Sequence, residues 1–252
     1  MKKQASRFLI LIFSVVCVAV CVLFANLISS AITVSGVSSN TLTYSSFCVY
    51  GISVGQYSSK ESAESFSAET KKKGGAGYVY KKDSLYHVLA SAYEKENDAK
   101  LVQKNLVESG IESTIVLIEI NEANFFNISS AEQKKQFENA LAVLRNTFLN
   151  LYDISVSLDT KAIDETKAKI QIIEVKSTVE KTINSISKGN SSLDGIYYQM
   201  IKNTFDEVEK ELLELKDYEN ISEISLSSKI KYVYVDILEK LDNLISNINN
   251  EI

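Results

Sequence analysis

The chain has 252 residues, a formal net charge of −5, a single histidine and no proline or tryptophan. The part after Asn121 is acidic, which argues against nucleic acid or an anionic membrane surface as the main partner. Metal-dependent hydrolases mostly need two or three histidine ligands, and only His87 is present. The glycines of Gly74–Gly77 follow a predicted helix, which indicates a helix stop and not a phosphate-binding loop. We therefore expect no metal, no cofactor and no enzymatic activity.

Residues 8–30 are predicted to be a transmembrane helix, because about 20 apolar residues are what a helix needs to cross a bilayer core. Lys2, Lys3 and Arg7 precede this segment and no basic residue follows it closely, which places residues 1–7 in the cytoplasm. The alternative is a cleaved signal peptide, although the apolar run is long for one. Residues 31–44 are rich in serine and threonine and carry no charge, so we expect an extracytoplasmic linker.

Residues 45–120 contain an internal repeat of one sequence pattern. Tyr57 recurs as Tyr93 and Gly74 recurs as Gly110, each 36 positions later. Each copy has a β-favouring run, a helix-period segment, a glycine and a second β-favouring run, which predicts a β-α-β unit. A fixed offset is stronger evidence than either copy alone. Two such units predict a ferredoxin-like βαββαβ domain, with both helices on one face of a four-stranded sheet and the other face open.

The segment that starts at Ile52, with the sequence Ile-Ser-Val-Gly-Gln-Tyr-Ser-Ser-Lys-Glu-Ser-Ala-Glu, resembles the SPOR domain family. A glycine turn, the run Leu-Tyr-His-Val from Leu85, Ala99 and Gly110–Ile111 follow in the order and spacing of that family. The family's later Val-Gly pair is replaced here by Ala90 and Ser91. The resemblance implies peptidoglycan binding, with a preference for glycan strands without stem peptides, as found at division and sporulation septa.

Candidate binding residues follow from this resemblance and from strand alternation. Side chains alternate along a strand, so Ile52 and Val88 are expected to face the helices while their neighbours point to the open face. SPOR domains carry Gln on the first strand, Arg near an aromatic residue on the third, and an apolar residue on the fourth. The corresponding candidates for glycan binding here are Ser53, Gln56, Leu85, Tyr86, His87 and Ile115. Strand phase favours Leu85 over Tyr86. Because the family's Gln and Arg are replaced, we predict weak binding.

Residues 125–252 show a helical pattern with four apolar stripes at three-or-four spacing. The stripes are Phe137, Leu141, Leu144, Phe148 and Leu151; Ile163, Ile170, Ile173, Val179, Ile183 and Ile186; Tyr197, Ile201, Phe205, Val208, Leu212 and Leu215; and Ile230, Val233, Ile237, Leu241, Leu244 and Ile248. They predict a four-helix bundle that folds on its own. The alternative is a long helical hairpin or coiled coil that a partner completes.

The sequence thus predicts an α+β protein with a transmembrane helix, a SPOR-like domain and an all-α bundle. Its expected function is non-enzymatic peptidoglycan binding by a single-pass membrane protein at the division or sporulation septum. The alternative is an extracytoplasmic protein–protein adaptor that works through the acidic helical bundle, with a degenerate SPOR-like scaffold. The sequence leaves open the partner of the bundle, the oligomeric state, and whether the protein serves division or sporulation.

Overall fold

The structure is a computed structural model that describes residues 41–186, 192–219 and 223–251. The predicted cytoplasmic residues 1–7 and the predicted transmembrane residues 8–30 lie outside these ranges. Within them, no helix combines the length and the apolar character that crossing a membrane requires. Residues 40–252 form one compact unit.

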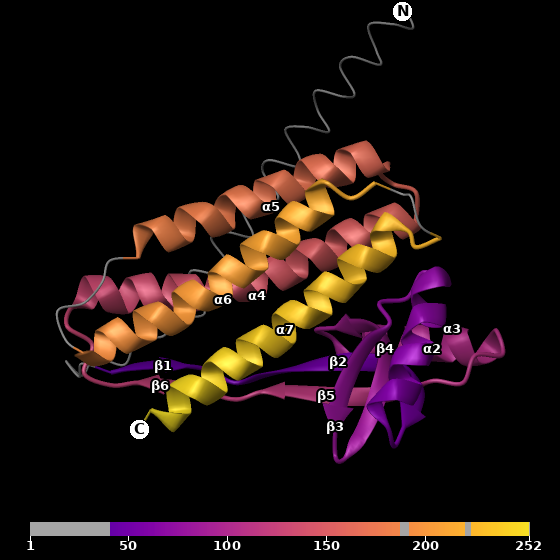
Figure 1. The fold of residues 1–252 in the computed structure, drawn as a ribbon, viewed down its shortest axis with the longest axis horizontal. Coiled ribbons are helices and arrows are strands. Elements are labelled where there is room, and N and C mark those ends of the chain that lie inside the picture. Colours follow the sequence, from indigo (N-terminus) through magenta and orange to yellow (C-terminus); the bar gives the residue numbers. More distant parts are fainter. Residues whose placement is uncertain (1–40, 187–191, 220–222, 252) are drawn as a thin grey trace, which may run out of the picture. The chain divides into compact units, whose positions relative to one another are not determined.

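The first half of this unit is a four-stranded antiparallel sheet in the order β3-β4-β2-β5 (Figure 1). The strands are β2 (Phe47–Tyr57), β3 (Tyr78–Lys82), β4 (Leu85–Tyr93) and β5 (Thr114–Ile120). Helix α2 (Lys60–Lys72) follows β2, and α3 (Glu96–Glu108) follows β4. Two β-α-β units joined in this way give the ferredoxin-like strand order. The prediction made from the 36-residue repeat is therefore confirmed.

The turn after α2 shows why glycines stand there. Gly74 and Gly77 have φ values of +88° and +59°, which lie in the left-handed region that glycine adopts without steric cost. A Cβ atom at Gly77 would lie 2.5 Å from the carbonyl oxygen of Ser67. The glycine-rich segment therefore ends α2 and turns the chain into β3, as predicted.

A second, two-stranded sheet pairs β1 (Leu42–Tyr44) with β6 (Ala123–Phe125). The prediction that residues 31–44 are a linker is wrong for this last part, since residues 42–44 form a strand. Leu42 and Phe125 are paired and almost fully buried, and the Phe125 ring lies 5.8 Å from that of Phe137. Burial of Leu42 in the helical core therefore holds this strand in place.

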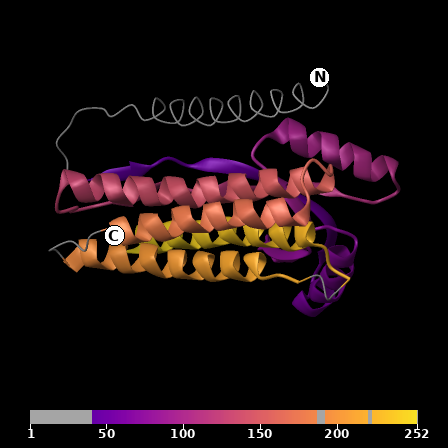
Figure 2. The ribbon, with the colours of Figure 1, turned by 90° about the horizontal axis from the view of Figure 1, so that it is seen from above.

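The second half is a bundle of four helices, as predicted (Figure 2). The helices are α4 (Ala131–Asp159), α5 (Glu165–Ser185), α6 (Ser192–Lys216) and α7 (Leu226–Asn250). Each packs against the next in the chain, and α7 also packs against α4. The N-terminus of α4 is capped by Ser130, whose Oγ accepts a hydrogen bond from the backbone N–H of Gln133.

Three of the four predicted stripes are buried in full, namely those of α4, α6 and α7. The stripe predicted for α5 is partly wrong, because Ile170 and Ile173 are 53% and 46% exposed. The buried face of α5 carries Ala168, Ile172 and Val175 beside the predicted Val179. This helix has isoleucines on both its buried and its exposed face. The positions of large apolar side chains therefore did not indicate which face packs against α4 and α6.

The sheet and the bundle share one hydrophobic core. The buried cluster runs from Val49, Leu89 and Ile118 in the sheet into the side chains of all four bundle helices. Helix α7 makes this junction, since it contacts β3, β4, β5, β6 and α2 as well as its bundle neighbours. The sheet therefore lies between α2 and α3 on one face and α7 on the other.

Candidate functional site

Strand register places four of the six predicted residues on the face opposite α2 and α3. His87 in β4 pairs directly with Gln56 in β2 and with Tyr80 in β3. Directly paired residues share a face of an antiparallel sheet. We call Tyr80, His87 and Gln56 the tip row, because they lie toward the β3–β4 turn. Leu85, two residues from His87 along β4, points to the same face.

The next row on this face consists of Tyr78, Leu89 and Ser53. It lies two residues from the tip row along β3 and β4, on the side away from the β3–β4 turn. We call it the covered row, because its members are 6%, 0% and 2% exposed. The hydroxyl of Ser53 donates a hydrogen bond to the carbonyl oxygen of Gly55, at 2.9 Å. Ser53 therefore lies on the predicted face, but below the surface.

Tyr86 and Ile115 lie on the other face. Tyr86 pairs with Tyr57 and Lys81, and the Lys81 ammonium group lies 5.7 Å from the centre of the Tyr86 ring. Ile115 pairs with Ile52, which is fully buried. The structure therefore separates these two predicted residues from Gln56, Leu85 and His87.

The prediction that the second sheet face is open is wrong over most of its area. Helix α7 covers it (Figure 1). The Tyr78 hydroxyl lies 2.8 Å from Asp236 Oδ1 and 2.6 Å from Glu239 Oε2. The ring of Tyr232 packs against that of Tyr78 at 5.1 Å. Val49, Leu89, Val116, Ile118 and Ile120 are all at most 7% exposed. Their apolar surface needs a cover, and α7 supplies it.

The tip row remains accessible in part. Gln56 is exposed, while Tyr80, Leu85 and His87 are half-buried. Burial lowers the pKa of His87, and the nearby Lys82 ammonium group lowers it further. The Nδ1 atom of His87 is buried and has no hydrogen-bond partner within the described ranges. The neutral imidazole is therefore the dominant form at neutral pH.

Tyr80 is the member of the tip row that was not predicted. Burial raises the pKa of its hydroxyl, as do the nearby carboxylates of Asp242 and Glu239 in α7. The sequence held a signal for it, since Tyr78, Tyr80 and Lys82 alternate and must share a face. That face could be assigned only once the pairing of Tyr80 with His87 was known.

The β3–β4 turn beside the tip row has an unusual backbone. Its central residues, Asp83 and Ser84, have φ values of +49° and +68°. Positive φ at both positions is the type I′ geometry, which matches the twist of a two-residue hairpin and usually takes Asn or Gly. The turn thereby fixes the pairing of Lys82 with Leu85 and holds the tip row in register.

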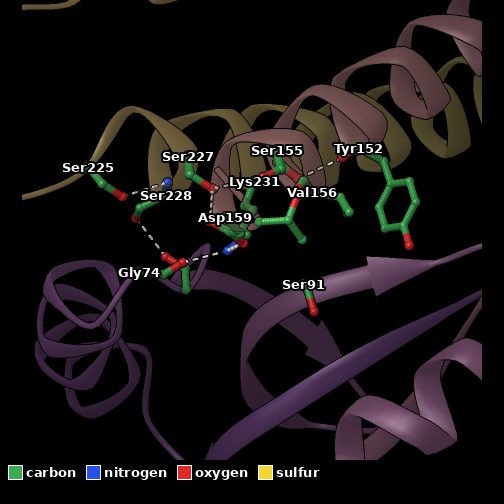
Figure 3. A network of polar contacts seen from close by, with 12 residues as sticks. Gly74, Ser91, Tyr152, Ser155, Val156, Asp159, Ser225, Ser227, Ser228 and Lys231 are labelled. Atoms are coloured by element: carbon green, nitrogen blue, oxygen red, sulfur yellow. Dashed lines mark hydrogen bonds and ion pairs between the residues drawn. The ribbon is translucent and has the colours of Figure 1, made fainter. Parts of the chain in front are cut away.

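A cavity of about 420 Å³ lies on the other side of β4, between α2, α3 and the ends of α4 and α7. Its walls are mainly apolar and include Phe66, Leu106 and Tyr152. Beside it, Lys231 forms an ion pair with Asp159 at 2.6 Å and donates a hydrogen bond to the carbonyl oxygen of Gly74 at 2.9 Å (Figure 3). The charges are thus paired within the protein, and none of the six predicted residues lines this cavity.

Among the residues that the structure describes, no group of three or more His, Cys, Asp or Glu side chains is arranged so that it could hold a metal ion.

The sequence model of the SPOR domain family matches residues 49–117. Among solved structures, the chain is similar to the peptidoglycan binding domain of the B. subtilis cell wall lytic enzyme CwlC, with 25% sequence identity and a TM-score of 0.26. That similarity covers 30% of this chain and 95% of the other. No curated protein matches the chain. The family match begins in β2 and ends in β5, so it spans the repeated unit and both of its helices. Residues 49–117 are a SPOR domain.

Proposed function

We propose that this protein binds peptidoglycan, through glycan strands without stem peptides, at the tip row of its SPOR domain. The observation that supports this most is the meeting of Tyr80, His87 and Gln56 on the one part of the predicted face that α7 leaves accessible.

The tip row suits a neutral sugar. The amide of Gln56 offers two hydrogen-bond donors and an acceptor. The neutral His87 ring offers Nε2, which donates or accepts according to the tautomer, because Nδ1 is buried. Tyr80 and Leu85 present apolar surface to the faces of sugar rings. A stem peptide would add bulk beside α7, where the covered row leaves no groove to receive it.

We also propose that residues 8–30 anchor the protein in the cell membrane, with residues 1–7 in the cytoplasm and the rest outside. The long apolar run, which is interrupted only by Ser14 and Asn26 as far as Ile28, and the basic residues before it support this orientation. The SPOR domain supports a place at the division or sporulation septum and a binding role without catalysis.

Sedimentation of the full chain with cell walls tests the proposal. Walls treated with an amidase, which removes stem peptides, should retain more protein than intact walls. The double variant Gln56→Ala with His87→Ala should lower this retention, whereas Tyr86→Ala, on the opposite face of the same strand, should not. Equal retention by both kinds of wall, unchanged in the double variant, would refute a glycan site at the tip row.

One observation favours a second function. Because α7 covers most of the sheet face, the SPOR domain also serves as a support for the bundle, as a protein–protein adaptor would require. The full chain carrying Gln56→Ala and His87→Ala separates the two functions in living cells. Septal localisation that survives this double change would favour the adaptor, and its loss would favour glycan binding.

A further inference from the structure

The boundary between covered and accessible parts of the sheet face runs between two neighbouring rows. Tyr78 in the covered row contacts Tyr232, Asp236 and Glu239 of α7. Tyr80, two residues further along β3, is only half-buried. The nearby carboxylates of Asp242 and Glu239 in α7 help to raise the pKa of its hydroxyl, after the larger effect of burial. Helix α7 therefore forms a wall directly beside the tip row.

This wall is fixed at both ends. At the start of α7, Ser228 and Lys231 donate hydrogen bonds to the carbonyl oxygens of Gly75 and Gly74, at 2.7 and 2.9 Å (Figure 3). At its end, Asn249 donates to the carbonyl oxygen of Glu122 at 2.8 Å and accepts a hydrogen bond from the N–H of Asn124.

The apolar surface below the helix fixes it further. Side chains such as Leu89 and Ile120 are at most 1% exposed, and lifting α7 away would return them to water. An exposed aliphatic side chain of this size is strongly unfavourable compared with a buried one. The wall is thus part of the folded state and not a lid.

A second contact limits the tip row from another side. The Lys82 ammonium group donates a hydrogen bond to the carbonyl oxygen of Leu117 in β5, at 2.6 Å. This contact joins the two edge strands of the sheet, β3 and β5, and so narrows the surface that the tip row leaves open.

We infer that α7 makes this face a closed-ended site, which takes a short glycan or the end of a glycan strand and not the middle of one. The inference rests on the proposed glycan binding. An open four-stranded face would let a strand pass across and add contacts with every sugar. Here α7 lies directly beside the tip row, so sugars that run toward the helix find no free strand surface to contact.

The dependence of affinity on ligand length tests the inference. We would titrate the full chain in a calorimeter with soluble, peptide-free glycan fragments of two, four and eight sugars. The dissociation constants should agree within about twofold, since all fragments make the same contacts. A gain of more than tenfold from four to eight sugars would overturn the closed-ended site and leave glycan binding intact. Absence of binding at every length would overturn the proposed function itself, and the inference with it.

Variants locate the site with the two-sugar fragment. Gln56→Ala should weaken binding by roughly 2- to 12-fold, the range expected for the loss of one net hydrogen bond. Tyr86→Ala is the matched control, because its side chain lies on the other face at the same end of the sheet, and it should leave the constant unchanged. If Tyr86→Ala weakened binding and Gln56→Ala left the dissociation constant unchanged, the ligand would lie on the other face, and the inference would be overturned.

Discussion

Replacing Leu89 by alanine should destabilise the sheet and the bundle together. Leu89 is fully buried in the middle of the sheet, and its two methyl groups lie 3.2 and 3.3 Å from where a Cβ atom of residue 51 would stand. Its side chain belongs to the cluster that continues into α4 and α7. Truncation of such a leucine leaves a cavity and costs about 2–5 kcal/mol.

The assay is thermal unfolding of residues 40–252, which form one compact unit, followed by circular dichroism. In a chain of this length, 1 kcal/mol corresponds to about 2–4 °C, so Tm should fall by about 4–20 °C. The helical signal and the near-ultraviolet tyrosine signal should fall together, because the sheet and the four bundle helices share one core. Leu101→Ala is the control, since Leu101 is 60% exposed in α3 and should change stability by less than about 0.5 kcal/mol.

The outcome that would refute this reasoning is a split transition. If the signals fell in two separate steps, with most of the helical signal keeping its original midpoint, the bundle would be an independent domain. The prediction from sequence that residues 125–252 fold on their own would then hold, and the shared core would contribute little to stability.

Two further changes test local features of the fold. Gly77→Ala should destabilise by more than about 1 kcal/mol, because its φ is +59° and the new Cβ would meet the Ser67 carbonyl oxygen, whereas Gly195→Ala in α6 should stabilise by about 0.5–1 kcal/mol; urea denaturation of both variants checks the difference in sign. Burial, followed by the neighbouring Asp236 carboxylate, raises the pKa of Glu211 to about 8 from its ordinary value of 4.5. The folded protein therefore holds this proton more tightly than the unfolded chain, so this contribution to stability is complete below pH 4.5 and is lost as the pH rises to about 8. Glu211→Gln should flatten the stability curve in that window, and an unchanged slope would mean that other groups cause it.

The repeat in the sequence was enough to predict the strand order, because a fixed offset between Tyr57 and Tyr93 depends only on local pattern. The stripe of α6 was equally clear, since it has one run of large apolar residues at helical spacing. The stripe of α5 was not, because the buried positions there include Ala168 and Thr182 while Ile170 is exposed. Which side of that helix meets α4 and α6 depends on tertiary packing, which a single-helix pattern does not contain.

The sequence predicted which sheet face most candidate residues share, but not which of them are exposed to solvent. Alternation correctly put Ser53, Leu85 and His87 on one face, since it depends only on strand geometry. Whether a residue on that face meets solvent depends on a helix more than one hundred residues away in the chain. Ser53 and Gln56 are three residues apart, and yet one is 2% exposed and the other lies open.

The sequence of α7 nevertheless contained evidence that this helix covers the sheet. A helix that packs only inside a bundle needs one apolar stripe, here Ile230, Val233, Ile237, Leu241, Leu244 and Ile248. Beyond that stripe, α7 also carries Tyr234, Val235, Leu238 and Ile245, all at most 1% exposed. A helix that is apolar on more than one side must be buried on more than one side. The surplus apolar residues of α7 match the surplus on the sheet, where Val49, Leu89 and Ile118 stand on a face that a sugar-binding surface would fill with polar groups. Each surface therefore explains the composition of the other, and the tip row is the part of this sheet face that stays partly accessible beside them.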